Sequence, residues 1–176
     1  MKERNRQVLK FLREGKKILE LGCGSAPLIK TLRKNQTYTG IDLNKKLIRT
    51  LKKKYPKHKF YAYNLEKDQV KLKEKYDCIL LIAFIEHMKN PDNLLKQVRK
   101  KLQNNGKIVL TTPTKIGDFL HTLGAYAGLT SMSAVQDHEK IYNKKDFFEL
   151  CKRNKLKLIH YKRFEFGLNQ IIVLSK

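Results

Sequence analysis

Short apolar runs alternate along the chain with segments whose apolar residues recur every three or four positions. The runs are typical of buried strands, and the longer period is typical of helices that face a core. The runs predict strands at residues 16–21, 38–42, 59–63, 76–83 and 106–112, and the longer period predicts helices at 3–14, 28–34, 44–55 and 92–102. Strands that alternate with helices favour a parallel sheet covered by helices on both faces.

The last third of the chain breaks this alternation. After residues 114–134, whose helical pattern is weak, the sequence predicts a helix at 144–153 and then strands at 156–164 and 168–174. The turn between these two strands, at Gly167, is too short for a parallel connection, so the strands form an antiparallel hairpin. We therefore expect an α/β fold with a mixed sheet, in which a C-terminal hairpin extends a parallel body.

The chain is strongly basic, with 39 Lys and Arg residues against 16 Asp and Glu and a formal net charge of +23. Such a charge attracts nucleic acids and anionic surfaces. The lysines, however, are scattered along the whole chain, and Arg, which suits bidentate contacts to phosphate, is the scarcer cation. This distribution favours a solvated basic surface over a dedicated nucleic-acid site.

Length and composition also limit the class of protein. A chain of 176 residues with 41% hydrophobic residues suits one compact domain, which we expect to span residues 1–176. No stretch approaches the roughly 20 apolar residues that cross a bilayer, and the first residues lack the apolar core of a signal peptide. Three cysteines without a CxxC pair indicate neither a disulfide framework nor a zinc site. We expect a cytoplasmic protein with no metal.

The turn after the first predicted strand carries candidate chemistry. It reads Glu20-Leu21-Gly22-Cys23-Gly24-Ser25-Ala26, and Ser25 is the predicted N-cap of the following helix. Glycines in such a turn let a ligand approach the backbone, although a tight connection alone would also explain them. Asp42 ends the next strand, where a carboxylate can accept both hydroxyls of a ribose. Together, the turn and the acid predict a nucleoside-containing ligand.

At these positions the chain resembles the class I S-adenosylmethionine-dependent methyltransferases. The first motif of that family is an acidic residue followed by GxGxG, which Glu20 to Ala26 match with Ala26 at the third glycine. Gly40-Ile41-Asp42-Leu43 matches the ribose motif, and residues 76–88 match the fourth strand and its exit. Asn64-Leu65-Glu66 stands where an acidic residue and its neighbour usually frame adenine. Asn64 departs from the pattern, but its amide can still hydrogen-bond an adenine edge.

The resemblance implies a Rossmann-like, seven-stranded sheet whose last strand is antiparallel, with S-adenosylmethionine as cofactor and S-adenosylhomocysteine as product. It also implies which residues hold the cofactor. These are Glu20, Gly22, Cys23, Gly24, Asp42, Leu43, Asn64, Leu65, Ala83 and Phe84. A nicotinamide-dependent reductase would share the glycine turn and the ribose acid, but the GxGxxG spacing of that class is not met.

Two histidines are candidate bases for the transfer. His87 follows the fourth strand, at the carboxyl end of the sheet where ligands of open α/β folds bind, and a histidine suits proton transfer near neutral pH. The Glu86-His87 pair resembles the small-molecule and quinone-type methyltransferases. His138 is the second candidate, because related enzymes place acceptor-facing residues after the variable segment. Residues 114–142 would then form a lid over the acceptor.

We therefore predict methyl transfer to an oxygen or carbon of a small or medium-sized organic molecule. Two alternatives remain open. An RNA methyltransferase would bring the lysine groups at 52–54, 100–101 and 144–145 together around the pocket. A protein that binds the cofactor without turnover, or serves as a scaffold, would explain Ala26 and Asn64 and the lack of a certain catalytic residue.

Overall fold

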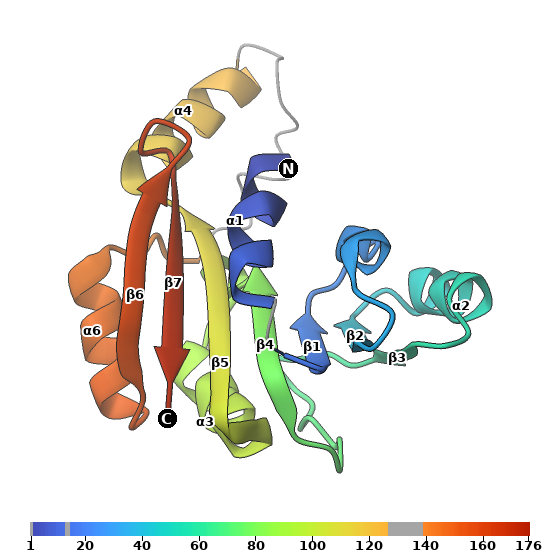
Figure 1. Ribbon diagram of the computed structural model, residues 1–176. Helices are drawn as coiled ribbons and strands as arrows, with labels where there is room; N and C mark the ends of the chain where they lie inside the picture. The colour runs from blue at the N-terminus through green and yellow to red at the C-terminus, as the bar shows by residue number, and fades with distance from the viewer. Residues whose placement is uncertain (1, 13–14, 127–138) are drawn as a thin grey trace.

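The computed structural model describes residues 2–12, 15–126 and 139–176, and its seven strands form one mixed sheet in the order β3-β2-β1-β4-β5-β7-β6 (Figure 1). Strand β7 runs antiparallel to both of its neighbours, and the remaining pairs are parallel. The strands are β1 Lys17–Leu21, β2 Thr37–Asp42, β3 Lys59–Ala62, β4 Tyr76–Ile82, β5 Leu102–Pro113, β6 Lys157–Phe164 and β7 Asn169–Ser175. The predicted mixed sheet and C-terminal hairpin are confirmed.

Helices cover both faces of the sheet (Figure 1). One apolar cluster joins the sheet to α1, η1 and α2, and a second joins it to α3 and α6. The helical segments are α1 Lys2–Leu12, η1 Pro27–Thr31, α2 Lys45–Lys54, η2 Ile85–His87, α3 Pro91–Lys101, α4 Lys115–Tyr126 and α6 Lys144–Arg153. No helix in the described part of the chain is long and apolar enough to cross a membrane.

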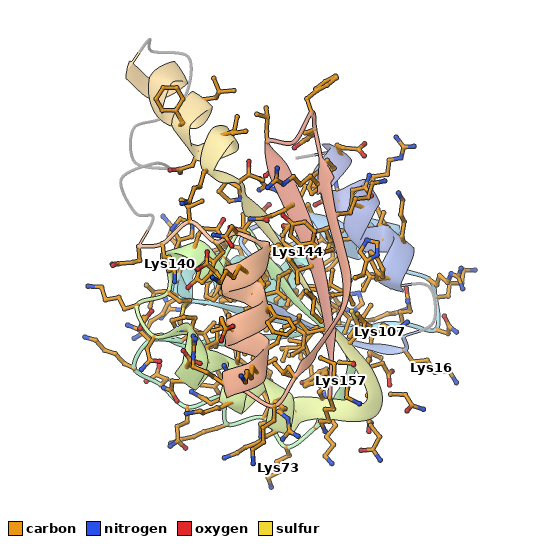
Figure 2. All side chains as sticks on the ribbon, turned by 90° about the vertical axis from the view of Figure 1, so that its left-hand side faces the viewer. Lys16, Lys73, Lys107, Lys140, Lys144 and Lys157 are labelled. Atoms are coloured by element: carbon orange, nitrogen blue, oxygen red, sulfur yellow. The ribbon has the colours of Figure 1, made fainter. Side chains whose placement is uncertain are left out.

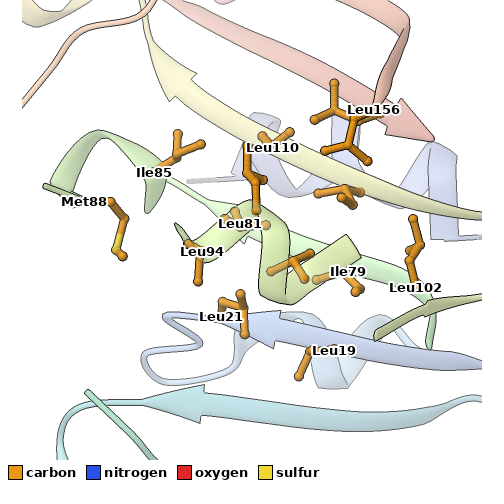
Figure 3. Packing of buried hydrophobic residues seen from close by; sticks show 14 of the residues in the cluster. Leu19, Leu21, Ile79, Leu81, Ile85, Met88, Leu94, Leu102, Leu110 and Leu156 are labelled. Carbon is orange, nitrogen blue, oxygen red and sulfur yellow. The ribbon is translucent and has the colours of Figure 1, made fainter. Parts of the chain in front are cut away.

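The central strands β1 and β4 are mostly apolar because both of their faces are buried. Successive residues of a strand point to opposite faces, so Leu19 and Ile79 join the cluster under α3 while Ile18 and Leu80 join the cluster under α1. Figure 3 shows the packing on the α3 side. Each of these side chains is fully removed from solvent, which stabilises the sheet by roughly 1.5–3 kcal/mol per large side chain.

The predicted helix at 28–34 is wrong in kind and extent. The structure has only a 3-10 segment at Pro27–Thr31, preceded by Ala26 in a left-handed conformation with no side-chain cap, so Ser25 is not its N-cap. The backbone N–H of Arg33, which a longer helix would have used, donates instead to Oε1 of Gln36 at 2.9 Å. The Gln36 amide also donates to two carbonyls near the end of α1, which fixes an extended connection into β2.

The carboxyl ends of the parallel strands β1 to β4 lie at one edge of the sheet. This edge therefore gathers the glycine turn after β1, Asp42 at the end of β2, the loop 63–66 after β3 and the segment 83–88 after β4. The opposite edge carries the ends of α2 and α3, because each of these helices leads back to the start of a strand.

Candidate functional site

The turn after β1 is held in a shape that glycine alone tolerates at its first position. Gly22 has a φ of 69°, and a Cβ on Gly22 would lie 2.2 Å from Cδ2 of Phe84. The ring of Phe84, which follows β4, thus packs directly on the backbone of the turn. At Gly24, with a φ of 48°, a Cβ would meet no atom within 4 Å. Phe84 therefore covers the turn at Gly22, whereas the turn is uncovered at Gly24.

Asp42 ties this turn to the end of β2. Its Oδ2 accepts a hydrogen bond from the backbone N–H of Gly24, and its Oδ1 accepts one from that of Asn44, both at 2.9 Å. The Cys23 N–H also donates to the Ile41 carbonyl at 2.9 Å. A carboxylate has about four acceptor positions, so each oxygen of Asp42 retains capacity for a ligand hydroxyl.

A cavity of about 310 Å³ opens where these loops meet. It is lined by Gly22, Asp42, Leu43, Tyr63, Asn64, Leu65, Glu66, Phe84, His87 and Met88. Six residues predicted to hold the cofactor thus come together with the candidate base His87. They derive from the exits of four different strands, and their grouping follows from the shared carboxyl edge of the sheet.

The other four predicted cofactor residues, Glu20, Cys23, Gly24 and Ala83, do not line the cavity. Glu20 is 3% exposed and accepts a hydrogen bond from the hydroxyl of Tyr38 at 2.5 Å. Burial raises the pKa of Glu20 to about 7 and that of Cys23 to about 12. Gly24 donates its N–H to Asp42, and Ala83, with a φ of 48°, donates its own to the Thr111 carbonyl at 2.8 Å. A direct contact of these four with the cofactor stays a prediction.

Asn64 closes a local turn and also lines the cavity. Its side-chain oxygen accepts from the Glu66 N–H at 3.1 Å, while its own N–H donates to Asp68 at 2.7 Å. These bonds form a local turn, and the same residue lines the cavity. The turn engages the amide oxygen of Asn64, and a contact of this amide with adenine stays a prediction.

Three residues that line the cavity were not predicted as site residues: Tyr63, Glu66 and Met88. Tyr63 follows β3, much as Asp42 ends β2. A search for site residues at the end of the third strand would therefore have found Tyr63. Glu66 accepts a hydrogen bond from the Lys89 N–H at 2.7 Å, which links the loop after β3 to the segment after β4. The sequence did not distinguish Met88 from a core residue. In the structure Met88 is 4% exposed, so it is buried like a core residue although it lines the cavity.

Part of the predicted acceptor region lies outside the described residues, including His138. Of the segment 114–142, the structure describes α4 and residues 139–142. The N–H of Glu139 donates to the carbonyl of Glu86 at 2.8 Å, so the segment returns beside the exit of β4. No three His, Cys, Asp or Glu side chains of the described residues are grouped so as to hold a metal ion.

Most of the chain matches a known protein family. Residues 1–161 match the family described as "Methyltransferase domain". The chain belongs to this family. It is a class I methyltransferase whose cofactor is S-adenosylmethionine, so the predictions of family, fold class and cofactor are confirmed.

The sequence identity to individual known proteins is low. The ubiquinone biosynthesis O-methyltransferase of Pelagibacter ubique is 27% identical over 148 residues, which cover 81% of this chain and 62% of that protein. The chain thus spans less than two thirds of that relative. A TehB-like S-adenosylmethionine-dependent methyltransferase from Corynebacterium glutamicum has a TM-score of 0.69 and 18% identity, with 98% of this chain and 86% of that one covered. An S-adenosylmethionine-dependent methyltransferase from Clostridium acetobutylicum has a TM-score of 0.74 and 11% identity, with 99% of this chain and 91% of that one covered.

The residues of the cavity fit the cofactor of this family. The Asp42 carboxylate suits a ribose diol, because it accepts hydrogen bonds and lies beside the open glycine of the turn. Leu43, at the rim of the cavity, is 66% exposed, although a side chain of its size is usually covered. Together with Leu65 and Met88 it offers an apolar surface that suits the faces of an adenine ring.

Proposed function

We propose that this chain transfers a methyl group from S-adenosylmethionine to an oxygen or carbon of a small organic acceptor. The observation that supports this proposal is the cavity at the carboxyl edge, where Asp42, the glycine turn and the residues 63–66 converge. Bound there, the cofactor supplies a methyl group on a positively charged sulfur, which is already a good leaving group. The protein then contributes mainly position and orientation.

Each part of the cavity has a separate task in this proposal. Asp42 binds the ribose hydroxyls, and Leu43 and Leu65 enclose the adenine, whose edge meets the Asn64 amide. The turn at Gly22 and Gly24 runs beside the methionine end of the cofactor. The backbone of Ala83 and Phe84 faces the reacting sulfur, as the first motif and the fourth strand exit imply.

A small acceptor is favoured over RNA by the arrangement of the lysines. Lys52–Lys54 end α2 and Lys100–Lys101 end α3, so both groups lie at the edge of the sheet opposite the cavity. Of the three groups, only Lys144–Lys145 lies at the start of a helix on the cavity side. Figure 2 labels six lysines, Lys16, Lys73, Lys107, Lys140, Lys144 and Lys157, which lie at separate places on the molecule. Two of the three lysine groups considered for RNA binding therefore lie away from the cavity.

The name of the Pelagibacter ubique relative supports oxygen as the acceptor atom. An O-methyl transfer must remove the hydroxyl proton, and His87, which lines the cavity, is a candidate base. His138 is the other candidate.

The test is calorimetric titration with S-adenosylmethionine and S-adenosylhomocysteine. We expect micromolar binding of both to the wild-type protein and none to Asp42→Ala. Asp77→Ala is a matched control, because Asp77 also accepts two backbone N–H bonds at 2.9 Å, from Lys16 and Lys17, but at the opposite edge. Binding that survives in Asp42→Ala, or fails in the wild type, would contradict the proposal.

A further inference from the structure

A groove of about 690 Å³, here termed the α6–β6 groove, lies between α6 and β6. Its lining residues all fall between Lys144 and Tyr161, so it shares none with the cofactor cavity. Consecutive residues 157–161 of β6 line it, although successive side chains of a strand point to opposite faces. The groove therefore follows the outer side of β6, where no other strand of the described chain pairs. Such an open edge is accessible to another chain.

Large apolar side chains of the α6–β6 groove are exposed to solvent. Phe148 of α6 is 58% exposed, and Ile159 of β6 is 50% exposed. Ile159 is the extra residue of a β-bulge, because the register of β6 with β7 shifts between Leu158 and His160. A bulge re-aims the side chain that it carries. Exposed apolar side chains that share one groove are typical of a surface that a partner covers.

The charged side chains that line the α6–β6 groove are all basic. They are Lys144, Lys152 and Lys157, whereas the acids of α6, Asp146 and Glu149, do not line it. No ion pair joins any of these three lysines to a described acid. The groove therefore suits an anionic partner. A second copy of this chain would be repelled, because it carries the same net charge of +23.

The lysines lie toward the two ends of the groove, with the exposed ring of Phe148 between them. Lys144, Phe148 and Lys152 follow one another at intervals of four along α6, so they share one face of the helix. The two lysines are thus about 12 Å apart along the helix axis. Lys157 begins β6, and Figure 2 shows it at the end of the groove opposite to Lys144. Nζ of Lys144 lies 5.6 Å from the centre of the Tyr161 ring, over the apolar floor.

We propose that the α6–β6 groove binds an extended segment of another protein, in which two acidic residues four positions apart flank an apolar residue. Alternate residues of an extended chain face one side, and four residues span about 13 Å, which matches the separation of the lysines. One acid pairs with Lys144, the other lies between Lys152 and Lys157, and the apolar side chain packs on Phe148 and Ile159.

A peptide fits this groove better than RNA does. RNA binds basic surfaces through its phosphates and stacks its bases on aromatic rings, whereas Ile159 is aliphatic and lies on an open strand edge. The inference is independent of the proposed function, because the groove and the cofactor cavity are separate.

The first test titrates the full chain with two isomeric peptides and follows its backbone amides by NMR. In Ser-Glu-Ala-Leu-Ala-Glu-Ser, both acids and the leucine share one face of the extended peptide. Ser-Ala-Glu-Leu-Glu-Ala-Ser has the same composition and charge, but its acids face away from the leucine. We expect submillimolar binding of the first peptide, about tenfold tighter than the second, with shifts confined to α6 and β6. Equal binding of the two peptides, no binding, or shifts elsewhere would overturn the proposal.

Variants then separate the groove from the general positive charge of the protein. Lys144→Gln and Lys157→Gln should each weaken the first peptide about two- to fivefold, the value of an exposed ion pair. Phe148→Ser should reduce its preference over the second peptide. Matched controls are Lys145→Gln and Lys162→Gln, since both lysines are exposed neighbours that do not line the groove. Equal weakening in the controls would show a non-specific attraction and would contradict the proposal.

A competition experiment tests RNA as the occupant. At physiological salt, a short oligouridylate should leave the first peptide bound, because the peptide also covers the apolar side chains of the groove. If the oligouridylate displaces the peptide, and its own binding is weakened in Lys144→Gln but not in Lys145→Gln, the groove is an RNA site and the proposal is wrong.

Discussion

The carboxylate of Asp42 is bonded to the backbone of Gly24, with 2.9 Å between the Gly24 nitrogen and Oδ2. One side chain therefore both shapes the glycine turn and faces the cavity beside it. These two roles have different chemical requirements, since the turn needs an acceptor atom and a ribose diol is bound best by a charged carboxylate.

Asp42→Asn should separate the two roles. An amide oxygen still accepts one backbone N–H, so the variant should fold with a melting temperature close to that of the matched Asp77→Asn variant. The loss of the charge should weaken S-adenosylhomocysteine binding roughly 10- to 100-fold. This factor corresponds to the free energy of about 1.5–3 kcal/mol that a hydrogen bond to a charged group contributes. Calorimetry measures the affinity. An unchanged affinity would show that Asp42 only supports the turn.

Gly22→Ala and Gly24→Ala form a matched pair. Both positions have a positive φ, so each variant should lose roughly 1 kcal/mol of unfolding free energy from backbone strain. Gly22→Ala should cost about 1–3 kcal/mol more, because its Cβ would clash with the ring of Phe84. Urea denaturation measures both values.

The clash can be tested directly in a second background. In Phe84→Ala, the ring is absent, so the additional cost of Gly22→Ala should disappear while the strain cost remains. If Gly22→Ala costs the same in both backgrounds, the contact between Gly22 and Phe84 is not what requires a glycine there.

Stability should fall between pH 5 and pH 8 because of Glu20. Burial raises its pKa to about 7 in the folded protein from 4.5 in an ordinary environment. The folded state then holds a proton that the unfolded state releases, so folding is most favoured below about pH 4.5 and loses roughly 3 kcal/mol as the pH rises through 7. Urea denaturation at several pH values measures the change.

Two variants check the assignment to Glu20. Glu20→Gln has no titrating group and should remove this part of the pH dependence. Tyr38→Phe removes the hydrogen bond that lowers the pKa of Glu20, so the loss of stability should extend to higher pH. Unchanged profiles in both would exclude Glu20 as the cause.

The three cysteines should resist alkylation in the folded protein. Cys23, Cys78 and Cys151 are free and buried, and burial raises the pKa of each thiol to about 11 or 12. Since the thiolate is the reactive form, iodoacetamide at pH 8 should leave the native mass unchanged and add three groups in denaturant. Rapid labelling of the folded protein at any of the three would contradict this burial.

Patterns within one segment predicted the sheet well. Residues 78–82 of β4 form an uninterrupted apolar run because both faces of the strand are buried. Gly167 marks the hairpin because so short a turn allows only an antiparallel pairing. The helix at 28–34 failed for a local reason, since the left-handed backbone at Ala26 and the side chain of Gln36 replace helical hydrogen bonds. The spacing of apolar residues carries no information about the backbone conformation of Ala26 or about the hydrogen bonds of Gln36.

The candidate site was predicted as far as strand ends define it. Asp42 was found because it ends a strand, and Asn64 was found through the family resemblance. The shared carboxyl edge of the sheet explains their common cavity with Phe84. The hydrogen bond from Arg4 to Asn169 could not be found in this way. The two residues are far apart in the sequence, and Arg4 lies on a helix whose contact with β5 and β7 depends on the completed sheet.

Strand β7 lies between β5 and β6, although it is the last strand of the chain. All residues that line the cofactor cavity lie between Gly22 and Met88, whereas Arg4 of α1 donates a hydrogen bond to Asn169 of β7. During synthesis, which runs from the N-terminus, the parts of the cavity emerge well before the strand that anchors Arg4. The last strand to be made thus closes the middle of the sheet, and the residues of the cofactor cavity are synthesised well before the sheet that holds them is complete.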